Sequence, residues 1–150
     1  MKIFITYFYN IRFFKPHTIP ISTAVWDPKW FHNFQGHDII FKDKNNVLNG
    51  IRYPDLSPVN IPQSCPCENK DPNNCQFIKD YAEYLNTLNF DKVYSDLLFI
   101  GNKAKEILKF DEEPEICLMV YEKPDNPCSE RKSLIEYFNK HGISITEWNK

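Results

Sequence analysis

The continuous apolar run "EICLMVYE" (115–122) constrains the fold more than any other stretch of this 150-residue chain. A strand with one solvent-facing side alternates apolar and polar residues, whereas an uninterrupted run is typical of a strand buried on both faces. Parallel sheets reach that burial because the helices that connect their strands cover the sheet. The run therefore predicts an inner strand of an α/β fold.

Further strands are expected where β-branched and aromatic residues gather, at 2–8, 18–25 and 143–148. Pro20 favours an edge position or a late start for the second of these, because proline cannot donate a hydrogen bond to the sheet. Apolar residues at helical spacing predict helices at about 75–88, 91–109 and 127–140. "DPNN" is expected to cap the first helix, and His141-Gly142 to end the last.

Strands separated by helices predict a single-domain α/β sandwich with a largely parallel sheet flanked by helices. The length suits one domain covering residues 1–150. Within it, 26–74 is a long irregular excursion that contains cysteines and most of the proline signals. An excursion of that length is either functional or tied down by other parts of the fold.

The loop "KPDNPCSER" (123–131) follows the buried strand, and ligands of α/β sheets bind beyond the carboxyl ends of strands. Asn126 and Pro127 suit the N-cap and first position of the next helix, which puts Cys128 in its first turn. The helix dipole would then lower the pKa of the thiol. The alternative is that Cys128 is an ordinary buried cysteine, since cysteine is among the most buried residue types.

An enzyme site at this loop gives each residue a role. Arg131 and Lys123 would bind a phosphate or carboxylate, and Glu122 would act as general acid or base. Cys128 would be the nucleophile or a ligand. The competing interpretation of Arg131 is a solvated surface ion pair of little energetic consequence.

The stretch "YEKPDNPCSER" resembles the Tyr-Glu-Lys-Pro…Cys-His-Arg signature of the domain-of-unknown-function 488 family. "KIFITYFYNIR" resembles that family's first strand with its Asn-x-Arg turn, and "PISTAVWDPKW" its second. "VLNGIRYPDLSP", "CQFIKDYAEYLNTLNFD" and "LIEYFNKHG" are similar to its middle and end. The resemblance implies a compact α/β domain and suggests an enzyme, without naming a reaction.

Two positions depart from that signature. Many members carry a cysteine before Tyr-Glu, where this chain has Val120. The histidine after the signature cysteine is replaced by Ser129 and Glu130 ahead of Arg131. A mechanism that needs the histidine or a cysteine pair is therefore in doubt here. The residues that the resemblance implies for the site are Asn10, Arg12, Ser22, Lys29, Trp30, Tyr121, Glu122, Lys123, Cys128 and Arg131.

The segment "CPCENKDPNNC" places Cys65, Cys67 and Cys75 within eleven residues. Three thiolates so close in sequence would suit zinc. The candidates for a fourth ligand are Cys128, Cys117, His32 and His37. The alternative is that Cys75 is buried on a helix face while Cys65 and Cys67 are exposed thiols. If Cys128 completed a zinc site, that site would be structural and Cys128 would not be a nucleophile.

The composition limits the partners. Net charge is −2, so no global basic field favours nucleic acid, although Trp26, Trp30 and Phe31 beside Lys29 would suit base stacking. A small anionic ligand is the expected partner. No run approaches the roughly 18 apolar residues of a membrane span, and the N-terminus resembles a strand rather than a signal peptide. We therefore expect a cytoplasmic protein, either an enzyme or a binding module with a zinc-stapled loop.

Overall fold

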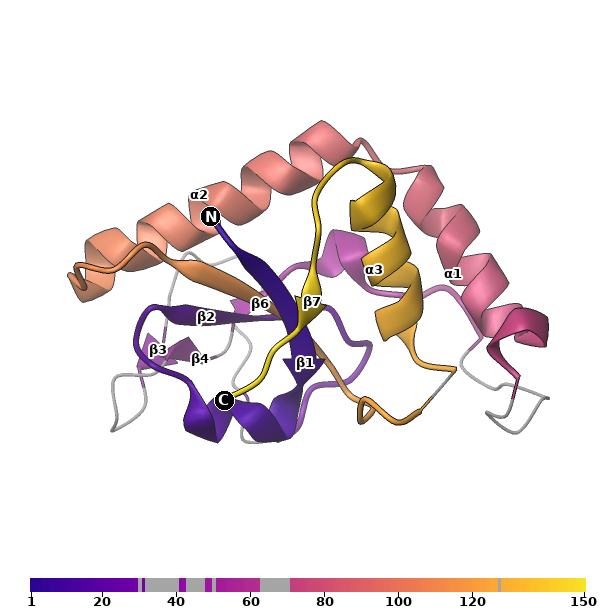
Figure 1. Ribbon diagram of the computed structural model, residues 1–150, viewed down its shortest axis with the longest axis horizontal. Coiled ribbons are helices and arrows are strands. Elements are labelled where there is room, and N and C mark those ends of the chain that lie inside the picture. The colour runs from indigo at the N-terminus through magenta and orange to yellow at the C-terminus, as the bar shows by residue number, and fades with distance from the viewer. Residues whose placement is uncertain (30, 32–40, 43–47, 50, 63–70, 127) are drawn as a thin grey trace.

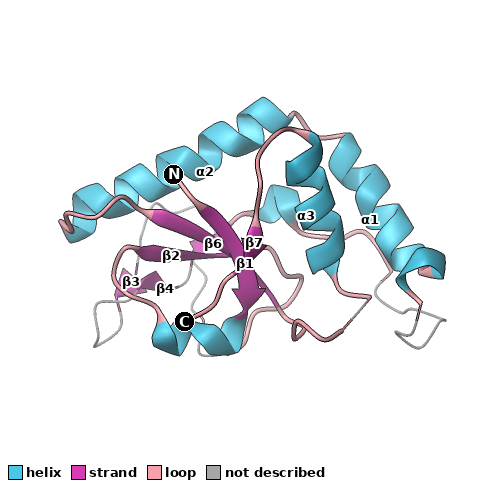
Figure 2. Cartoon of the chain, viewed as in Figure 1, coloured by secondary structure: helices cyan, strands magenta, loops and turns pink. Residues whose placement is uncertain are grey.

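The structure is a computed structural model that describes residues 1–29, 31, 41–42, 48–49, 51–62, 71–126 and 128–150. Its centre is a five-stranded sheet in the order β5-β2-β6-β1-β7, and every described pairing in it is parallel. The strands are β1 (Ile3–Tyr7), β2 (Thr18–Ser22), β5 (Ile51–Arg52), β6 (Glu115–Val120) and β7 (Thr146–Glu147). Figure 1 and Figure 2 show the sheet with its helices. The predicted α/β class is confirmed.

The α-helices are α1 (Gln76–Asn86), α2 (Phe90–Leu108) and α3 (Glu130–Lys140). Three 3₁₀ turns accompany them: η1 (Phe8–Phe13), η2 (Pro54–Leu56) and η3 (Pro72–Asn74). A separate antiparallel pair is formed by β3 (Phe41–Lys42) and β4 (Leu48–Asn49). The described helices include none that is long and apolar enough to cross a membrane.

β6 is buried on both faces, as its apolar run predicts. Ile116, Leu118 and Val120 belong to the larger core, together with residues of all three α-helices. Cys117 and Met119 face the other way and pack with Phe8, Ile11 and Phe14 of and beside η1. The period of two along a strand produces this division. The α-helices therefore cover one face of the sheet and η1 the other, as Figure 1 shows.

The prediction that Pro20 marks an edge strand or a late strand start is wrong, because β2 lies between β5 and β6 and begins at Thr18. The carbonyl of Ser22 accepts from Tyr53 N at 2.9 Å, so this backbone group faces β5. Pro20, two residues earlier, points to the same side, and the described pairing of β5 with β2 begins only at Ile21. The missing N–H is therefore tolerated inside the sheet because β5 is short.

The excursion at 26–74 contributes structure that the sequence did not reveal. It supplies β5, and η2 follows directly. Two tyrosines of α1 hold η2 in place: Tyr81 donates its hydroxyl to the carbonyl of Leu56, and Tyr84 donates to that of Asp55 at 2.7 Å. The part of the excursion that the structure describes is thus tied to the helical layer.

The start of α3 differs from the prediction. The helix begins at Glu130, and its N-cap is Ser129, whose Oγ accepts from Arg131 N at 2.9 Å. The N–H of Arg131 has no partner within the helix, and the hydroxyl of Ser129, two residues earlier, accepts from it more readily than the more distant Asn126. Asn126 instead accepts from Cys128 N at 3.0 Å, in a turn ahead of the helix. Cys128 therefore lies outside the first turn of α3.

Other ends shift less. β2 stops at Ser22 and β7 keeps only Thr146–Glu147 of the predicted 143–148. Cys75 is the N-cap of α1 and makes no capping bond with its side chain, whereas Asp71 of "DPNN" caps η3 by accepting from Asn73 N. At the end of α3 the prediction is confirmed: His141 is the C-cap and Gly142 has a φ of +83°.

Candidate functional site

The order of the strands creates a crevice at their carboxyl ends. After β2 the chain passes to β5 at one edge of the sheet, and after β6 it passes through α3 to β7 at the other edge. β2 and β6 are neighbours, so their following segments leave in opposite directions and open a gap between them. This is the position where open α/β sheets bind ligands.

A cavity of about 460 Å³ occupies this gap. On one side it is lined by Ala24–Asp27, which follow β2. On the other it is lined by Tyr121 and Glu122, which follow β6, and by Glu130, the first residue of α3. The volume falls within the range of small-molecule sites, roughly 300–1,000 Å³. We call this cavity the β2/β6 crevice.

Two carboxyl groups of the β2/β6 crevice lie in environments that oppose ionisation. Burial raises the pKa of Glu122 above its ordinary value, although the charge of Arg131 partly opposes the rise. Glu130 is only 4% exposed, and its burial raises the pKa well above the ordinary value; the nearby Glu122 raises it further. Oε2 of Glu122 is buried and has no hydrogen-bond partner among the described residues. The environment therefore favours the protonated form of both groups more than solvent would.

A third carboxyl group, Asp27, is charge-paired. Its Oδ1 accepts from Nη1 of Arg52 at 3.0 Å and from the hydroxyl of Ser22. Both side chains of the Arg52–Asp27 pair are about 10% exposed. Ser22 also accepts from Ala24 N at 3.3 Å, which fixes the turn after β2. Ser22, predicted to bind substrate, thus orients Asp27 beneath the crevice.

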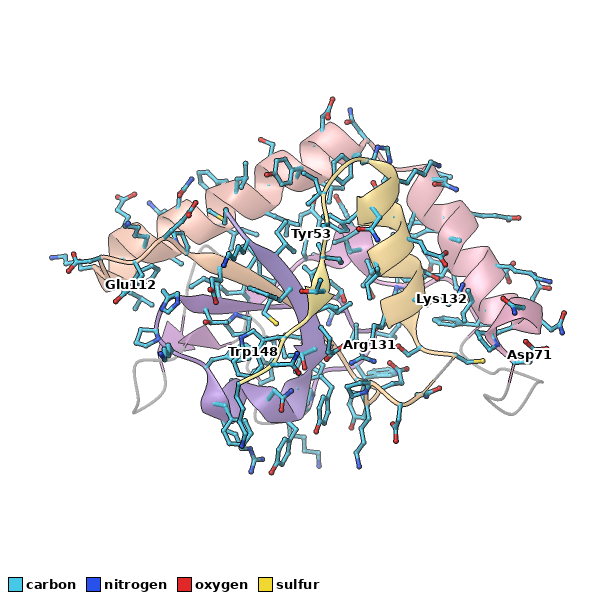
Figure 3. All side chains as sticks on the ribbon, in the orientation of Figure 1. Tyr53, Asp71, Glu112, Arg131, Lys132 and Trp148 are labelled. Carbon is cyan, nitrogen blue, oxygen red and sulfur yellow. The ribbon has the colours of Figure 1, made fainter. Side chains whose placement is uncertain are left out.

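Arg131, which is labelled in Figure 3, connects the first turn of α3 with β7 and with the loop after β6. Its Nε donates to Glu147 Oε1 of β7 at 2.6 Å, and Nη1 donates to the carbonyl of Lys123 at 3.1 Å. The side chain is buried, and Nη2 has no partner among the described residues. The interpretation of Arg131 as a solvated surface pair is therefore wrong. Its position also differs from the predicted anion-binding role, because it clamps the 121–131 loop to β7.

Cys128 lies in a different cluster from the crevice residues. It is 5% exposed and packs with Cys75, Phe77 and Ile78. The predicted lowering of its pKa is wrong: burial and the neighbouring thiol of Cys75 raise it. The reason is that Cys128 precedes α3 and faces an apolar cluster instead of the helix N-terminus. Its assignment as nucleophile or ligand stays a prediction.

The predicted zinc ligands are only partly described. Cys75 is fully buried at the start of α1 and lies beside Cys128. Cys117 packs with η1 on the other face of the sheet, so it does not share a site with Cys75. Cys65, Cys67, His32 and His37 lie outside the described residues. Among the described residues, no group of three or more histidine, cysteine or acidic side chains is arranged to hold a metal ion.

The remaining site candidates that the structure describes lie in the segments that follow β1, β2 and β6. Asn10 donates to Thr6 Oγ1 at 2.8 Å, which is a structural contact inside the turn after β1. Arg12 is exposed and lies over the ring of Tyr9. Tyr121 is 60% exposed at the rim of the crevice. Lys29 and Lys123 are exposed, and Trp30 lies outside the described residues.

Sequence reasoning missed Glu130 and Asp27. Glu130 was visible in the quoted loop only as part of a departure from the family signature. A glutamate in the first turn of a helix is ordinarily a solvated group that favours the dipole. Asp27 follows Trp26 in a turn with no distinctive spacing. The one indication in the sequence was their location, because Asp27 and Glu130 lie in the segments that follow two predicted strands.

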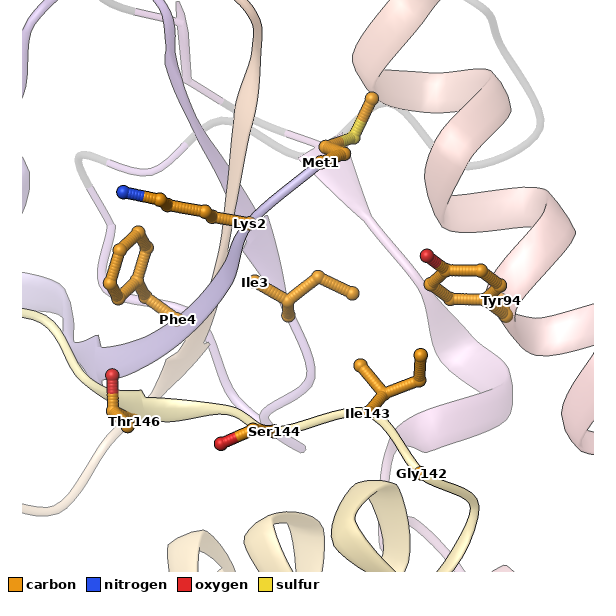
Figure 4. Close-up of a pocket in the computed structure, with 9 residues that line it drawn as sticks. All are labelled: Met1, Lys2, Ile3, Phe4, Tyr94, Gly142, Ile143, Ser144 and Thr146. Carbon is orange, nitrogen blue, oxygen red and sulfur yellow. The ribbon is translucent and has the colours of Figure 1, made fainter.

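A second cavity, of about 430 Å³, lies at the amino ends of β1 and β7. Figure 4 shows its lining, which includes Met1, Lys2, Tyr94 and the Ile143–Ser144 segment. No described residue that lines it carries a carboxyl group. It offers apolar contact and a few hydroxyl groups, without a pair of groups suited to proton transfer.

Neither a scan against family models nor searches of curated proteins and of solved structures gave a match for this chain. The likeness to the domain-of-unknown-function 488 family therefore stays a prediction.

Proposed function

We propose that this protein is an enzyme that performs general acid–base chemistry on a small anionic substrate in the β2/β6 crevice. The observation that carries the proposal is the presence of two carboxyl groups with raised pKa values, the half-buried Glu122 and the buried Glu130, in the lining of one cavity. Carboxyl groups whose environments move their pKa values apart are typical of acid–base pairs in enzymes.

The two carboxyl groups take different roles. Glu130 is fully buried and lies next to a second acid, so it holds its proton more firmly and acts as the acid. Glu122 has the smaller environmental shift and exchanges its proton with the substrate as base or acid. Arg131 is a positioning residue, because it acts on Glu122 and Glu130 through their charges and holds the loop through Glu147.

The substrate's anionic group is assigned to exposed cations at the rim. Lys123 follows Glu122 directly, and Lys29 follows the turn that holds Asp27. Both lysine side chains are exposed, so their ammonium groups are accessible to an anion from solvent. This revises the predicted partnership of Arg131 with substrate, because that guanidinium already pairs with Glu147.

An NMR titration of the glutamate side-chain carboxyl carbons tests the proposal without a known substrate. We expect two glutamates to titrate above the ordinary value of 4.5, and each of these signals to vanish in Glu122→Gln or Glu130→Gln. Glu83→Gln, at an exposed position on α1, is the control, and both crevice signals should persist in it. Two crevice glutamates that both titrate near 4.5 would contradict the proposal.

A screen of small phosphates and carboxylates then supplies the reaction. Turnover should fall by about 10²-fold or more in Glu122→Gln, as removal of a general acid or base typically does. Glu83→Gln should retain full activity. A substrate whose turnover is unchanged in both Glu122→Gln and Glu130→Gln would place catalysis elsewhere.

A second candidate is a non-catalytic binding module whose cysteine loop is stapled by zinc. The observation in its favour is that Cys75 and Cys128, 53 positions apart in sequence, lie in one buried cluster. Two thiols brought together by the fold supply half of a tetrahedral zinc site, and Cys65 and Cys67 would supply the rest. We expect stoichiometric zinc in native protein if this is correct, and its loss in Cys75→Ser and Cys128→Ser. Cys117→Ala, on the other face of the sheet, is the matched control.

Two further assignments belong to this proposal. Membership of the domain-of-unknown-function 488 family is supported by the position of its signature, since Tyr121 and Glu122 line the crevice. A cytoplasmic location is supported by the five cysteines, an odd number that suits thiols or metal ligands rather than a disulfide framework.

A further inference from the structure

A second hollow lies beside the β2/β6 crevice and shares Tyr121 with it. Its volume is about 240 Å³, and its lining is Tyr7, Phe8, Tyr9, Arg12, Pro28 and Tyr121. These residues come from the end of β1, from η1 and from the segments that follow β2 and β6. We call it the aromatic hollow. It is aromatic and basic in its lining, whereas the crevice next to it is acidic.

The guanidinium of Arg12 is held in place before any ligand arrives. Its carbon lies 3.7 Å from the centre of the Tyr9 ring, and its Nε donates to the carbonyl of Tyr9 at 3.1 Å. Tyr7 stacks on Tyr9, with ring centroids 5.8 Å apart. The side chain is exposed, so its terminal nitrogens face solvent at the hollow. A guanidinium fixed in this way loses little entropy when it binds a phosphate.

Aromatic rings remain exposed around the hollow. Tyr121 is 60% exposed and meets Phe8 only edge to face, at 6.2 Å between centroids. Trp26, which lines the adjoining crevice, is 76% exposed, and Tyr9 is 46% exposed. Clustered exposed aromatic side chains are typical of binding surfaces, and a ring face that is open can stack on a planar ligand.

The lining of the aromatic hollow includes the cation Arg12 and no acidic side chain, whereas the adjoining crevice is acidic. The first acidic residue in the chain is Asp27, so β1, η1 and β2 contain none, while Arg12 and Lys15 lie in and beside η1. Lys150 lies 4.0 Å from the centre of the Phe13 ring, at the end of η1. The overall net charge of −2 therefore hides a local basic region.

We propose that the aromatic hollow binds a nucleotide, with the base stacked on Tyr121 and the phosphate on Arg12. This phosphate is the anionic group of the proposed substrate, and the rim lysines Lys29 and Lys123, which follow the hollow residues Pro28 and Tyr121, bind it together with Arg12. The pairing of an open ring with a pre-oriented guanidinium selects a ligand that has both a planar base and an anionic group. Because Tyr121 lines both cavities, a nucleotide held in this way presents its sugar and base edge to Glu122 and Glu130. This inference rests on the proposed function and names its substrate class.

Probe binding to the full chain tests the inference. Adenine and cytosine mononucleotides, the matching nucleosides, ribose phosphate and inorganic phosphate are titrated in turn, followed by calorimetry and by the emission of the exposed Trp26. We expect the mononucleotides to bind about tenfold or more tightly than the nucleosides, ribose phosphate or phosphate, because stacking and ion pairing both contribute. Ribose phosphate or phosphate binding as tightly as the mononucleotides, or no mononucleotide binding, overturns the inference.

Variants assign the contacts. Tyr121→Ala should weaken mononucleotide binding about tenfold or more while leaving ribose phosphate binding unchanged. Arg12→Gln should weaken the binding of mononucleotides and of ribose phosphate and leave nucleoside binding unchanged. Arg12→Lys keeps the charge but lacks the planar guanidinium, so its affinity for mononucleotides should lie between those of the parent protein and Arg12→Gln. The controls are Phe99→Ala, a 63% exposed ring on α2, and Lys79→Gln, an exposed cation on α1. Equal losses in a variant and its control would overturn the assignment.

Two sources of nucleotide are separated by adding single-stranded oligonucleotides. A free mononucleotide is the ligand if an oligonucleotide binds no more tightly than its monomer. A nucleotide within a single strand is the ligand if affinity rises with length and falls with salt. If mononucleotides fail to bind while Glu122 and Glu130 titrate as expected, the inference falls and the acid–base site stands. If binding holds while those glutamates titrate normally, the aromatic hollow stands and the proposed catalysis falls.

Discussion

The two ends of the sheet carry cavities of nearly equal size and very different chemistry. The β2/β6 crevice at the carboxyl ends measures about 460 Å³, and the cavity at the amino ends measures about 430 Å³. The first is lined by Asp27, Glu122 and Glu130, whereas the described lining of the second contains no carboxyl group. Volume alone therefore does not identify a functional site in this protein.

Topology explains the difference. At the carboxyl ends, the segments after β2 and β6 diverge, and the chain places polar loop residues and the first turn of α3 around the gap. At the amino end, the cavity is enclosed by the start of the chain and by Ile143–Ser144, which lead into β7. Loops carry polar groups because their backbone must meet water, and a divergent pair of loops leaves those groups facing one another.

The largest expected loss of stability concerns the buried ion pair beside the β2/β6 crevice. Asp27→Ala leaves the guanidinium of Arg52, about 10% exposed, without its carboxylate. Removing one partner of a buried ion pair costs about 3 kcal/mol of unfolding free energy. Lys132→Ala breaks a surface pair with Glu136 on α3 and should cost at most about 0.5 kcal/mol. Urea unfolding measures both, and equal losses would mean that the Arg52–Asp27 pair is no more structural than a surface pair.

A smaller loss is expected where the loop is clamped to β7. Arg131→Met removes the bonds to Glu147 and to the carbonyl of Lys123. About 2 kcal/mol should be lost, less than for a fully buried pair because 26% of the Glu147 side chain is exposed. The pKa of Glu122 and of Glu130 should also rise further, since the charge of Arg131 lowers both. An unchanged glutamate titration in this variant would contradict its positioning role.

The pH dependence of stability distinguishes the crevice through its protons. The folded pKa values of Glu122 and Glu130 lie above the unfolded value near 4.5. Between the unfolded and the folded pKa values, the folded state therefore binds more protons than the unfolded state. Stability is therefore greatest below pH 4.5 as far as these groups contribute, and it falls as pH rises through their folded pKa values. The slope is at most about 1.4 kcal/mol per pH unit for each group.

Glu130→Gln should remove part of this decline, because its amide cannot ionise. Thermal or denaturant unfolding of both proteins between acid and alkaline pH gives the comparison. Glu83→Gln, at an exposed position, should leave the slope as it is in the parent protein. Parallel curves for Glu130→Gln and the parent would show that the buried acid ionises without cost.

The smallest effect is expected beside the amino-end cavity. A methyl group at Gly101 in α2 would lie 2.8 Å from Met1 Sδ and 3.1 Å from Ile116 Cδ1. The Met1 side chain must shift, because 2.8 Å is too short for a contact with a Cβ atom, and the gain of about 1 kcal/mol in helix propensity of alanine over glycine offsets this cost. Gly101→Ala should therefore change stability by less than about 1 kcal/mol and leave the crevice titration unaltered. A shift in the pKa of Glu130 would show that the two ends communicate.

Some of the site followed from local pattern. The run at 115–122 placed β6 inside a parallel sheet, and the rule for strand ends then placed Glu122 at a binding edge. The prediction that Cys128 lies in the first turn of the helix failed because the sequence offers two possible N-caps, the amide of Asn126 and the hydroxyl of Ser129. Which of them caps α3 depends on the packing of the loop against α1.

The sequence by itself determined the three α-helices, the strands β1, β2, β6 and β7, and the edge of the sheet that carries the candidate site, because periodicity and strand-end rules depend on neighbouring residues alone. Only the tertiary structure decided which side chains are buried there. The pKa of Glu130 is raised because burial removes its carboxyl group from water and Glu122 lies nearby, and Cys128 faces Cys75 because α1 packs beside the loop. Desolvation and charge are summed over segments far apart in sequence, so no local pattern specifies them.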